Sequence, residues 1–212
     1  MVTPGQRTSI GAFKNDSLLF LPGTRYFYSS FGYVLLSLAI ERAAHRPFLD
    51  VIHREVLGPL GMRETAPDRP DSAIAMRAVP YDTDSAGHIV RAVNDDLSNR
   101  WAAGGYVGTV MDLARFGFAF LDDKYLKRES VTMMTSPQRL TDGSATLVGM
   151  GWRIGTDSSG RTIWHHAGSA VGGRAVLVVW PEDGIVVAIA GNMLVTMSER
   201  TAFRFAEAVR RR

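Results

Sequence analysis

The last third of the chain changes its hydrophobic period, and this change constrains the fold more than any other feature of the sequence. Three short runs of apolar or β-branched residues lie there between glycines, at 162–165, 174–180 and 185–190. Such runs predict β-strands. The second and third are apolar at nearly every position, so we expect their hairpin to be buried on both faces. Pro181-Glu182-Asp183-Gly184 joins them, and Asp-Gly readily supplies the positive φ angles that a hairpin turn requires.

Helical periodicity dominates before these strands. After a turn at Pro22-Gly23, the spacing predicts a helix with Ser30 as its N-cap and one apolar face: Phe31, Val34, Leu35 and Leu38. A second helix is predicted from Pro47 to Gly58-Pro59, and we expect it to turn four residues inward: Leu49, Ile52, Val56 and Leu57.

Two further helices are predicted from their capping patterns. Thr109 caps a helix that runs through Phe120, with Asp112 at its third position. Residues 196–199 form a capping box for a final helix through Val209. Residues 63–100 are rich in Asp, Pro, Ser and Arg, and predict a long loop with short strands. The order is helices, then an antiparallel sheet, then a helix packed on it, which is an α+β fold.

Composition excludes several classes of function. The net charge is only +3, and the arginines are scattered apart from Arg210-Arg211-Arg212. A nucleic-acid binder clusters its cations on one face, so we expect no nucleic-acid partner. The chain has no cysteine, which excludes disulfides, thiol catalysis and thiolate metal sites. The five histidines lack the i, i+4 spacing of metal ligands, and no G-x-G-x-x-G follows a strand, so we expect neither a metal nor a cofactor.

No stretch of the sequence resembles a membrane span or a signal peptide. The longest apolar stretch near the start, 34–40, is far shorter than the roughly 20 residues that a spanning helix needs. No signal peptide follows Met1. We therefore expect no membrane segment in this chain, and the sequence leaves its compartment open.

Two short motifs offer candidate catalytic side chains, although each is weak alone. Tyr28 precedes a predicted helix, a position that can direct a phenol into a cleft, but a single Tyr-Ser-Ser is more often an ordinary, partly buried tyrosine. His166 lies in a stretch rich in tryptophan and glycine, where a histidine is usually a packing or surface residue.

The order of the motifs carries more information than any one of them. Seven occur in sequence: Leu21-Pro22-Gly23, Tyr28-Ser29-Ser30, Leu57-Gly58-Pro59-Leu60-Gly61-Met62, Ala102-Ala103-Gly104-Gly105, Asp112-Leu113-Ala114-Arg115-Phe116, Gly149-Met150-Gly151-Trp152 and His166-Ala167-Gly168. From about residue 13 onward this series resembles the β-lactamase-related serine hydrolases, which include class C β-lactamases, D-alanyl-D-alanine carboxypeptidases and esterases. Residues 13–33 look especially like the mitochondrial serine β-lactamase-like branch of the family and its bacterial relatives.

The resemblance implies a role for each matching residue. Tyr28 falls on the tyrosine of the family's Y-x-N motif, the general base and acid, and a phenol needs adjacent cations to act as a base. His166 falls on the lysine of K-T-G, where histidine is a common variant that can polarise the tyrosine. Gly168 completes that motif, and the backbone N–H of Ser169 matches half of the oxyanion hole.

Two matching positions depart from the family pattern. Ser30 stands where Y-x-N has the asparagine that holds the substrate's acyl-amide group. Ala167 stands where K-T-G has a hydroxyl that helps to bind the substrate carboxylate. Both changes weaken the case for β-lactams and D-Ala-D-Ala peptides, and they leave room for an esterase or a peptidase.

The family's nucleophile is absent from these 212 residues. The chain's lysines are Lys14, Lys124 and Lys127, and none has a serine three residues before it, so no S-x-x-K occurs. We expect residues 1–212 to be an incomplete domain, the C-terminal portion of a β-lactamase/transpeptidase-like fold. Residues of about 24–150 would form a helical and loop region, and about 151–212 would form the sheet strands and the last helix.

The resulting hypothesis is a hydrolase that acts on a small-molecule ester, amide or peptide. The acyl-serine would form on a serine outside this chain, and the fragment alone would be inactive. The alternatives are a non-catalytic scaffold or interaction protein, a binding module that keeps the cleft without the chemistry, and an inactive gene remnant. The incomplete sheet would leave an unpaired edge, so we also expect self-association.

Overall fold

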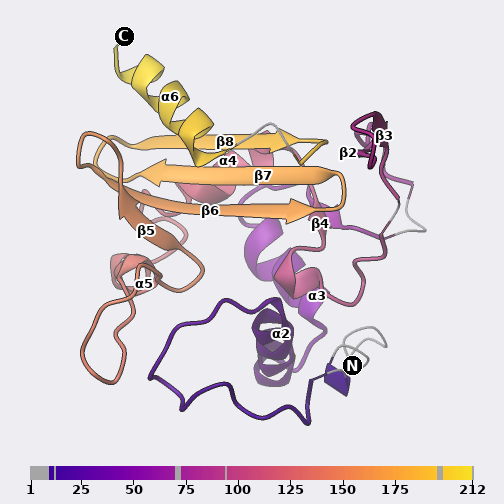
Figure 1. Cartoon of the computed structure of the whole chain (residues 1–212). Coiled ribbons are helices and arrows are strands. Elements are labelled where there is room, and N and C mark those ends of the chain that lie inside the picture. The colour runs from indigo at the N-terminus through magenta and orange to yellow at the C-terminus, as the bar shows by residue number, and fades with distance from the viewer. Residues whose placement is uncertain (1–9, 12, 70–72, 94, 195–197, 212) are drawn as a thin grey trace.

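An antiparallel four-stranded sheet organises the molecule. The computed structural model of the protein describes residues 10–11, 13–69, 73–93, 95–194 and 198–211. The sheet runs in the order β5 (Arg153–Thr156), β6 (Thr162–Ala170), β7 (Gly173–Trp180) and β8 (Ile185–Gly191). The three predicted strands correspond to β6, β7 and β8 (Figure 1). β6 continues to Ala170 and therefore includes the whole His166-Ala167-Gly168 motif.

Helices cover both faces of this sheet. Along β7, Val176, Val178 and Trp180 pack with Ala202 and Ala206 of α6 (Glu199–Arg210). The alternating residues Leu177 and Val179 pack on the other face with Ala119 and Phe120, at the end of α4 (Val110–Phe118). Figure 1 shows α6 and α4 on opposite sides of the strands. The predicted burial on both faces is confirmed for β7, whereas β8 is only half-buried because it lies at the edge of the sheet.

The turn between β7 and β8 differs in one respect from the prediction. Within the turn 181–184, Gly184 alone has a positive φ angle, of 64°. Asp183, the other residue of the predicted Asp-Gly pair, does not have one. The turn therefore needs the conformational freedom of one glycine and not of the Asp-Gly pair.

The helical region precedes the sheet in the chain. α2 (Ser30–Ala44) is followed by α3 (Phe48–Ile52), which begins after Pro47 as predicted and continues as the π-helix η1 (His53–Leu57). Glu41 of α2 is buried, and its Oε1 accepts a hydrogen bond of 2.7 Å from the Phe48 N–H. This carboxylate satisfies one of the free amides at the start of α3.

The prediction for α2 was wrong in two details. The N-cap is Ser29, whose Oγ accepts a hydrogen bond of 3.2 Å from the Gly32 N–H, and Ser30 is the first helical residue. The predicted apolar face is only partly buried: Val34 is buried, but Phe31 and Leu35 are exposed. The helix packs with η2 (Trp101–Ala103) and α3, whereas Phe31 packs with the Phe13 ring at a centroid distance of 5.0 Å and stays about half exposed.

The remaining elements are short. The predicted loop 63–100 contains β1 (Ala66–Pro67), β2 (Tyr81–Thr83) and β3 (Ile89–Arg91); β1 pairs with β4 (Tyr106–Val107), and β2 pairs with β3. α5 (Arg128–Thr135) precedes the sheet. Thr109 caps α4 as predicted, because its Oγ1 accepts from the Asp112 N–H.

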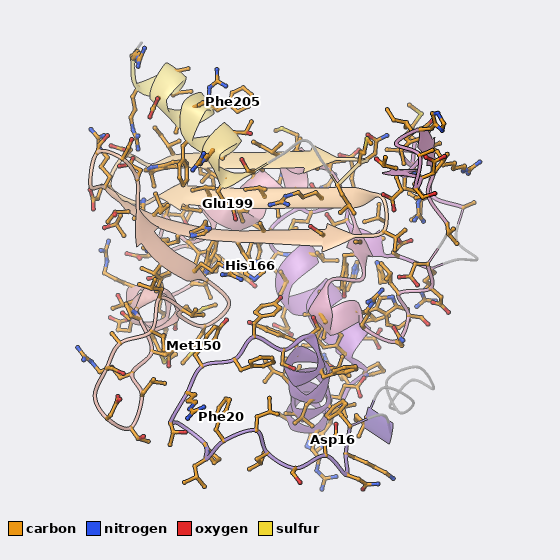
Figure 2. The ribbon with its side chains drawn as sticks, viewed as in Figure 1. Asp16, Phe20, Met150, His166, Glu199 and Phe205 are labelled. Atoms are coloured by element: carbon orange, nitrogen blue, oxygen red, sulfur yellow. The ribbon has the colours of Figure 1, made fainter. Side chains whose placement is uncertain are left out.

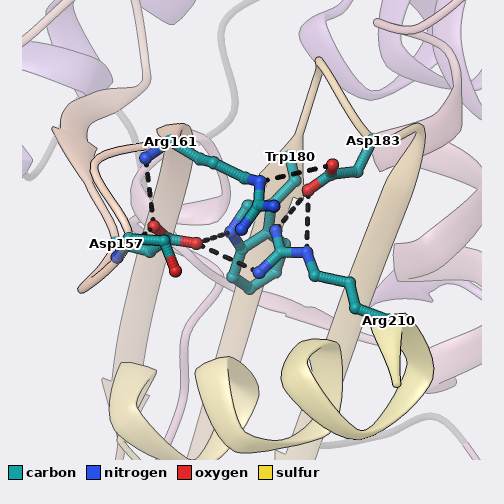
Figure 3. A network of polar contacts seen from close by, with 6 residues as sticks. Asp157, Arg161, Trp180, Asp183 and Arg210 are labelled. Atoms are coloured by element: carbon teal, nitrogen blue, oxygen red, sulfur yellow. Dashed lines mark hydrogen bonds and ion pairs between the residues drawn. The ribbon is translucent and has the colours of Figure 1, made fainter.

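A network of charges holds α6 against the sheet (Figure 3). The Asp157 carboxylate accepts from the Trp180 indole N–H at 3.0 Å and from Arg210 at 3.1 Å. Arg210 also pairs with Asp183. The N-cap of α6 is Ser198, while Thr196 of the predicted capping box lies outside the described residues.

Candidate active site

Tyr28 is held between a turn and a helix cap. The Thr24 N–H and Oγ1 both donate to the Leu21 carbonyl, and Gly23 takes a φ of 81°, which confirms the Pro22-Gly23 turn. On the other side of Tyr28, Ser29 caps α2. The sequence thus fixes the backbone on both sides of the tyrosine, and the ring is less than half exposed to solvent.

His166 lies on β6 and faces Tyr28. The centroids of the two rings are 6.4 Å apart. Because strand side chains alternate, His166 and Gly168 lie on the face that carries α4, and Ala167 lies on the face that carries α6. Figure 2 shows His166 on the side of β6 toward the helical region, and Glu199 at the start of α6.

Tyr28 and His166 both line an open cavity of about 370 Å³ between the sheet and the helical region. Aromatic and aliphatic side chains form most of its wall, from α4, β7 and the segment before β5: Leu113, Phe116, Phe120, Met150, Trp152 and Leu177. Phe120, Trp152 and Leu177 also belong to the buried cluster under the sheet. The cavity is therefore an apolar space that opens directly beside the two polar rings.

Arg153 places a positive charge beside the Tyr28 ring. Its guanidinium carbon lies 5.9 Å from the centroid of the Tyr28 ring, which is a cation–π distance. Burial and, second, the Arg153 charge lower the pKa of His166 below its ordinary value. Burial is also the main reason why the pKa of His165 is lowered. Burial and the Arg153 charge thus both favour the neutral imidazole of His166.

Of the other predicted site residues, Gly168 lines the cavity, whereas Ser30, Ala167 and Ser169 are not part of its lining. Ser30 is exposed at the start of α2. Ala167 packs against the cluster on the α6 face, and Ser169 is exposed near the end of β6. β5 pairs with β6 only from Thr162 to His165, so residues 166–170 have a strand partner on the β7 side alone among the described residues. Their roles in substrate binding stay predictions.

Sequence reasoning missed three residues of the site. Tyr33, which lies in the first turn of α2, also lines the cavity. Its pKa is raised, mainly by burial. Trp152 was noticed only as part of a motif, and Arg153, the residue after it, was not noticed at all. The signal available for Arg153 was weak, because β5 is short and carries no apolar run that would have predicted a strand.

The described ranges hold neither a metal-binding cluster nor a membrane-spanning helix. No group of three or more His, Asp or Glu side chains within them is arranged to hold a metal ion. Within the same ranges, no helix combines the length and the apolar character needed to cross a membrane.

Comparisons with known proteins give this arrangement a context. The family model for beta-lactamase matches residues 4–210. The mitochondrial serine beta-lactamase-like protein LACTB of Mus musculus is 32% identical over 236 residues, which cover 93% of this chain and 43% of that protein. The chain therefore spans less than half the length of this curated relative.

Solved structures show the same fold. The octameric penicillin-binding protein homologue from Pyrococcus abyssi has a TM-score of 0.73 and 26% identity, with 90% of this chain and 45% of that chain covered. The penicillin-binding protein from Bacillus halodurans has a TM-score of 0.79 and 19% identity, with 96% of this chain and 62% of that chain covered. The predicted α+β, transpeptidase-like fold is confirmed by these likenesses.

Proposed function

Because the chain belongs to the beta-lactamase family, we propose that it contributes the Tyr28 and His166 half of a serine hydrolase site. The reaction is cleavage of an ester or an amide through an acyl-serine. Tyr28 is the general base, and His166 lies beside it on the sheet. The observation that carries the proposal is the pairing of these two rings, 6.4 Å apart, at the mouth of one cavity.

The nucleophile in this proposal comes from outside the 212 residues. The chain contains no Ser-x-x-Lys. The cavity beside Tyr28 is lined by Phe120, Trp152 and Leu177, which are residues of core type. An apolar helix that carries Ser-x-x-Lys would bury these side chains and place its serine next to the tyrosine.

The edge of β6 offers a backbone hydrogen-bond donor for the oxyanion. A two-residue loop joins Ala170 to Gly173, and the closing pair of such a hairpin exchanges hydrogen bonds. By alternation, the next pair, Ser169 and Arg174, does not, so the Ser169 N–H points away from β7. It therefore points to the edge that β5 leaves unpaired, where it can donate to a developing oxyanion.

The test is covalent labelling of the serine. The chain alone, and the chain co-expressed with a polypeptide that carries the family's Ser-x-x-Lys helix, are treated with a fluorophosphonate. We expect labelling only in the complex and only on that serine, with loss of the label in Tyr28→Phe. A label on a serine of this chain would contradict the proposal.

A second candidate function is a non-catalytic scaffold. It is favoured by the edge of β8, to which no described strand pairs, and by the many exposed apolar side chains around α2. The P. abyssi relative is described as octameric. A complex that forms but neither labels nor hydrolyses p-nitrophenyl esters would support this alternative.

A further inference from the structure

Arg153 occupies a distinctive place in the sheet. It is the first residue of β5 and lies opposite His165, at the point where β5 stops pairing with β6. Its guanidinium reaches the Tyr28 ring at 5.9 Å. None of the ion pairs between described residues includes Arg153, so no carboxylate of the described chain neutralises it.

We propose that, within the described chain, Arg153 and not His166 supplies the positive charge beside Tyr28, in addition to the lysine that the Ser-x-x-Lys helix would bring. The inference rests on the proposed function, in which Tyr28 is the general base, and it assigns a positioning role to a residue outside the family's motifs. Arginine suits this role because its guanidinium stays charged at every pH at which a hydrolase works.

The environment of His166 makes the histidine unsuitable as that charge. Burial first, and Arg153 second, lower the pKa of His166, while a hydrogen bond to the Ala167 backbone and the Glu199 charge act in the opposite direction. The charged or titratable groups around it are Arg153, Tyr28 and Tyr33 on the cavity side, and His165 and Glu199 on the other face of β6. Glu199 is the only anion among them, and it pairs with Arg174 and His165 on the other face of β6. The surroundings of His166 therefore favour its neutral, hydrogen-bonding form.

Arg153 and His166 together can replace a single lysine, which would supply both a positive charge and hydrogen bonds. Arg153 supplies a permanent positive charge 5.9 Å from the centroid of the phenol ring, where it attracts negative charge that develops on Tyr28 during the reaction. Neutral His166 can accept or donate a hydrogen bond without adding a second cation. Because Arg153 is exposed, its effect on Tyr28 weakens at high ionic strength.

Nitration by tetranitromethane tests the charge directly, since this reagent attacks the phenolate form of tyrosine. The 212-residue chain, dilute and at fixed pH, is nitrated and each tyrosine is quantified by mass spectrometry. In Arg153→Gln we expect Tyr28 to react on the order of threefold more slowly, the effect of losing a unit charge about 6 Å away in a water-like dielectric. Arg153→Lys should restore the rate.

Tyr26 is the internal control, because it is also half exposed and lies only two residues away, whereas the Arg153 guanidinium lies over the ring of Tyr28. Its nitration should not change in either variant. Arg128→Gln, which removes an exposed arginine elsewhere, should leave both tyrosines unchanged. Equal slowing of Tyr26 and Tyr28, or an unchanged rate at Tyr28 in Arg153→Gln, would overturn the proposal.

Carbethoxylation of His166 by diethylpyrocarbonate provides a second readout, because only the neutral imidazole reacts. In a His165→Gln background, Arg153→Gln should shift the pH profile of His166 upward, since a cation that lowers its pKa is lost. Arg153→Lys should keep the wild-type profile. An identical profile in all three proteins would overturn the proposal, whereas failure of the labelling experiment above would count only against the proposed function.

Discussion

At the scale of single residues, the site depends on where a helix begins. Ser29 caps α2, and Tyr28 is the residue immediately before the cap, so the cap hydrogen bond fixes the backbone that carries the phenol. His166 is fixed differently, by pairing opposite Leu177 in the middle of β6. The two candidate catalytic residues are therefore positioned by independent elements that meet at one cavity.

The first prediction concerns the Tyr28 hydroxyl. In the complex that contains the serine, Tyr28→Phe should lower kcat roughly 10²- to 10⁴-fold, the range for loss of a general base. KM should change much less, because the ring and its contact with Arg153 remain. Steady-state kinetics with a p-nitrophenyl ester measure both values, and a near-normal kcat would assign Tyr28 to packing.

The second prediction uses two adjacent serines. Ser29→Ala removes the cap of α2 and should cost about 1 kcal/mol in the free energy of unfolding. Ser30→Ala is the matched control, since Ser30 is the first helical residue and does not cap the helix. Urea unfolding of both variants, followed by fluorescence, gives the comparison. If Ser30→Ala were the more destabilising variant, the helix would begin one residue later.

This one-residue difference illustrates what the sequence could and could not predict. Ser29 and Ser30 are both good caps by type, and local periodicity cannot choose between them. Arg153 was missed for a related reason: its role arises from a contact between β5 and the loop before α2, which lie about 125 residues apart in the chain. Tyr28 and His166 were found from ordered motifs and not from their periodicity. The family resemblance on which those motifs rest is confirmed by the matched family model.

At the scale of elements, period and turn chemistry predicted β6, β7 and β8 well, because apolar strands between glycines leave few alternatives. Strand β5 was not predicted, since it is short and its side chains are only partly buried. The exposure of Phe31 and Leu35 on α2 was also not predicted. An apolar stripe shows that a helix face can be buried, but it does not show which part of the molecule covers it.

The third prediction concerns the attachment of α6. Burial alone would raise the pKa of Asp157, but hydrogen bonds from the Arg161 N–H, the Trp180 indole, the Ser159 N–H and Arg210 hold the pKa below its ordinary value. A lowered pKa in the folded state means that this carboxylate stabilises the fold above its unfolded pKa of about 3.9 and loses that contribution as the pH falls through the folded value.

Asp157→Ala should therefore destabilise the protein at pH 7 by about 1–3 kcal/mol, because the buried Trp180 N–H loses its acceptor. The loss of stability between pH 5 and pH 3 should be smaller in this variant than in the wild type. Urea midpoints followed by tryptophan fluorescence at each pH measure both effects. Asp123→Ala, an exposed carboxylate with a weak ion pair at 3.7 Å, is the control and should change neither value. A normal acid sensitivity in Asp157→Ala would show that the network does not hold α6.

At the scale of the whole molecule, apolar surface is unusually abundant. Leu18, Leu19 and Leu21 are each about three-quarters exposed, and several side chains of α2 add to them. Phe205 and Val209 are exposed along α6. Figure 2 shows Phe205 near β8, whose outer edge pairs with no described strand. Large exposed apolar surfaces are typical of sites that contact another polypeptide, a ligand or a membrane. The domain limits predicted from the sequence, about 24–150 and 151–212, stay a prediction.

The last prediction is that the 212-residue chain self-associates through the edge of β8. The strand 185–191 carries neither lysine nor proline, the residues that commonly protect an exposed strand edge. Sedimentation velocity at micromolar concentration should show oligomers that dissociate on dilution. Ala190→Lys should shift the population toward monomer, because Ala190 is exposed on the edge strand and the new charges would repel each other across a paired interface. Ala208→Lys adds the same charge at an exposed position of α6 and serves as the control. A monodisperse wild-type monomer, or equal dissociation in both variants, would show that the β8 edge is not the contact.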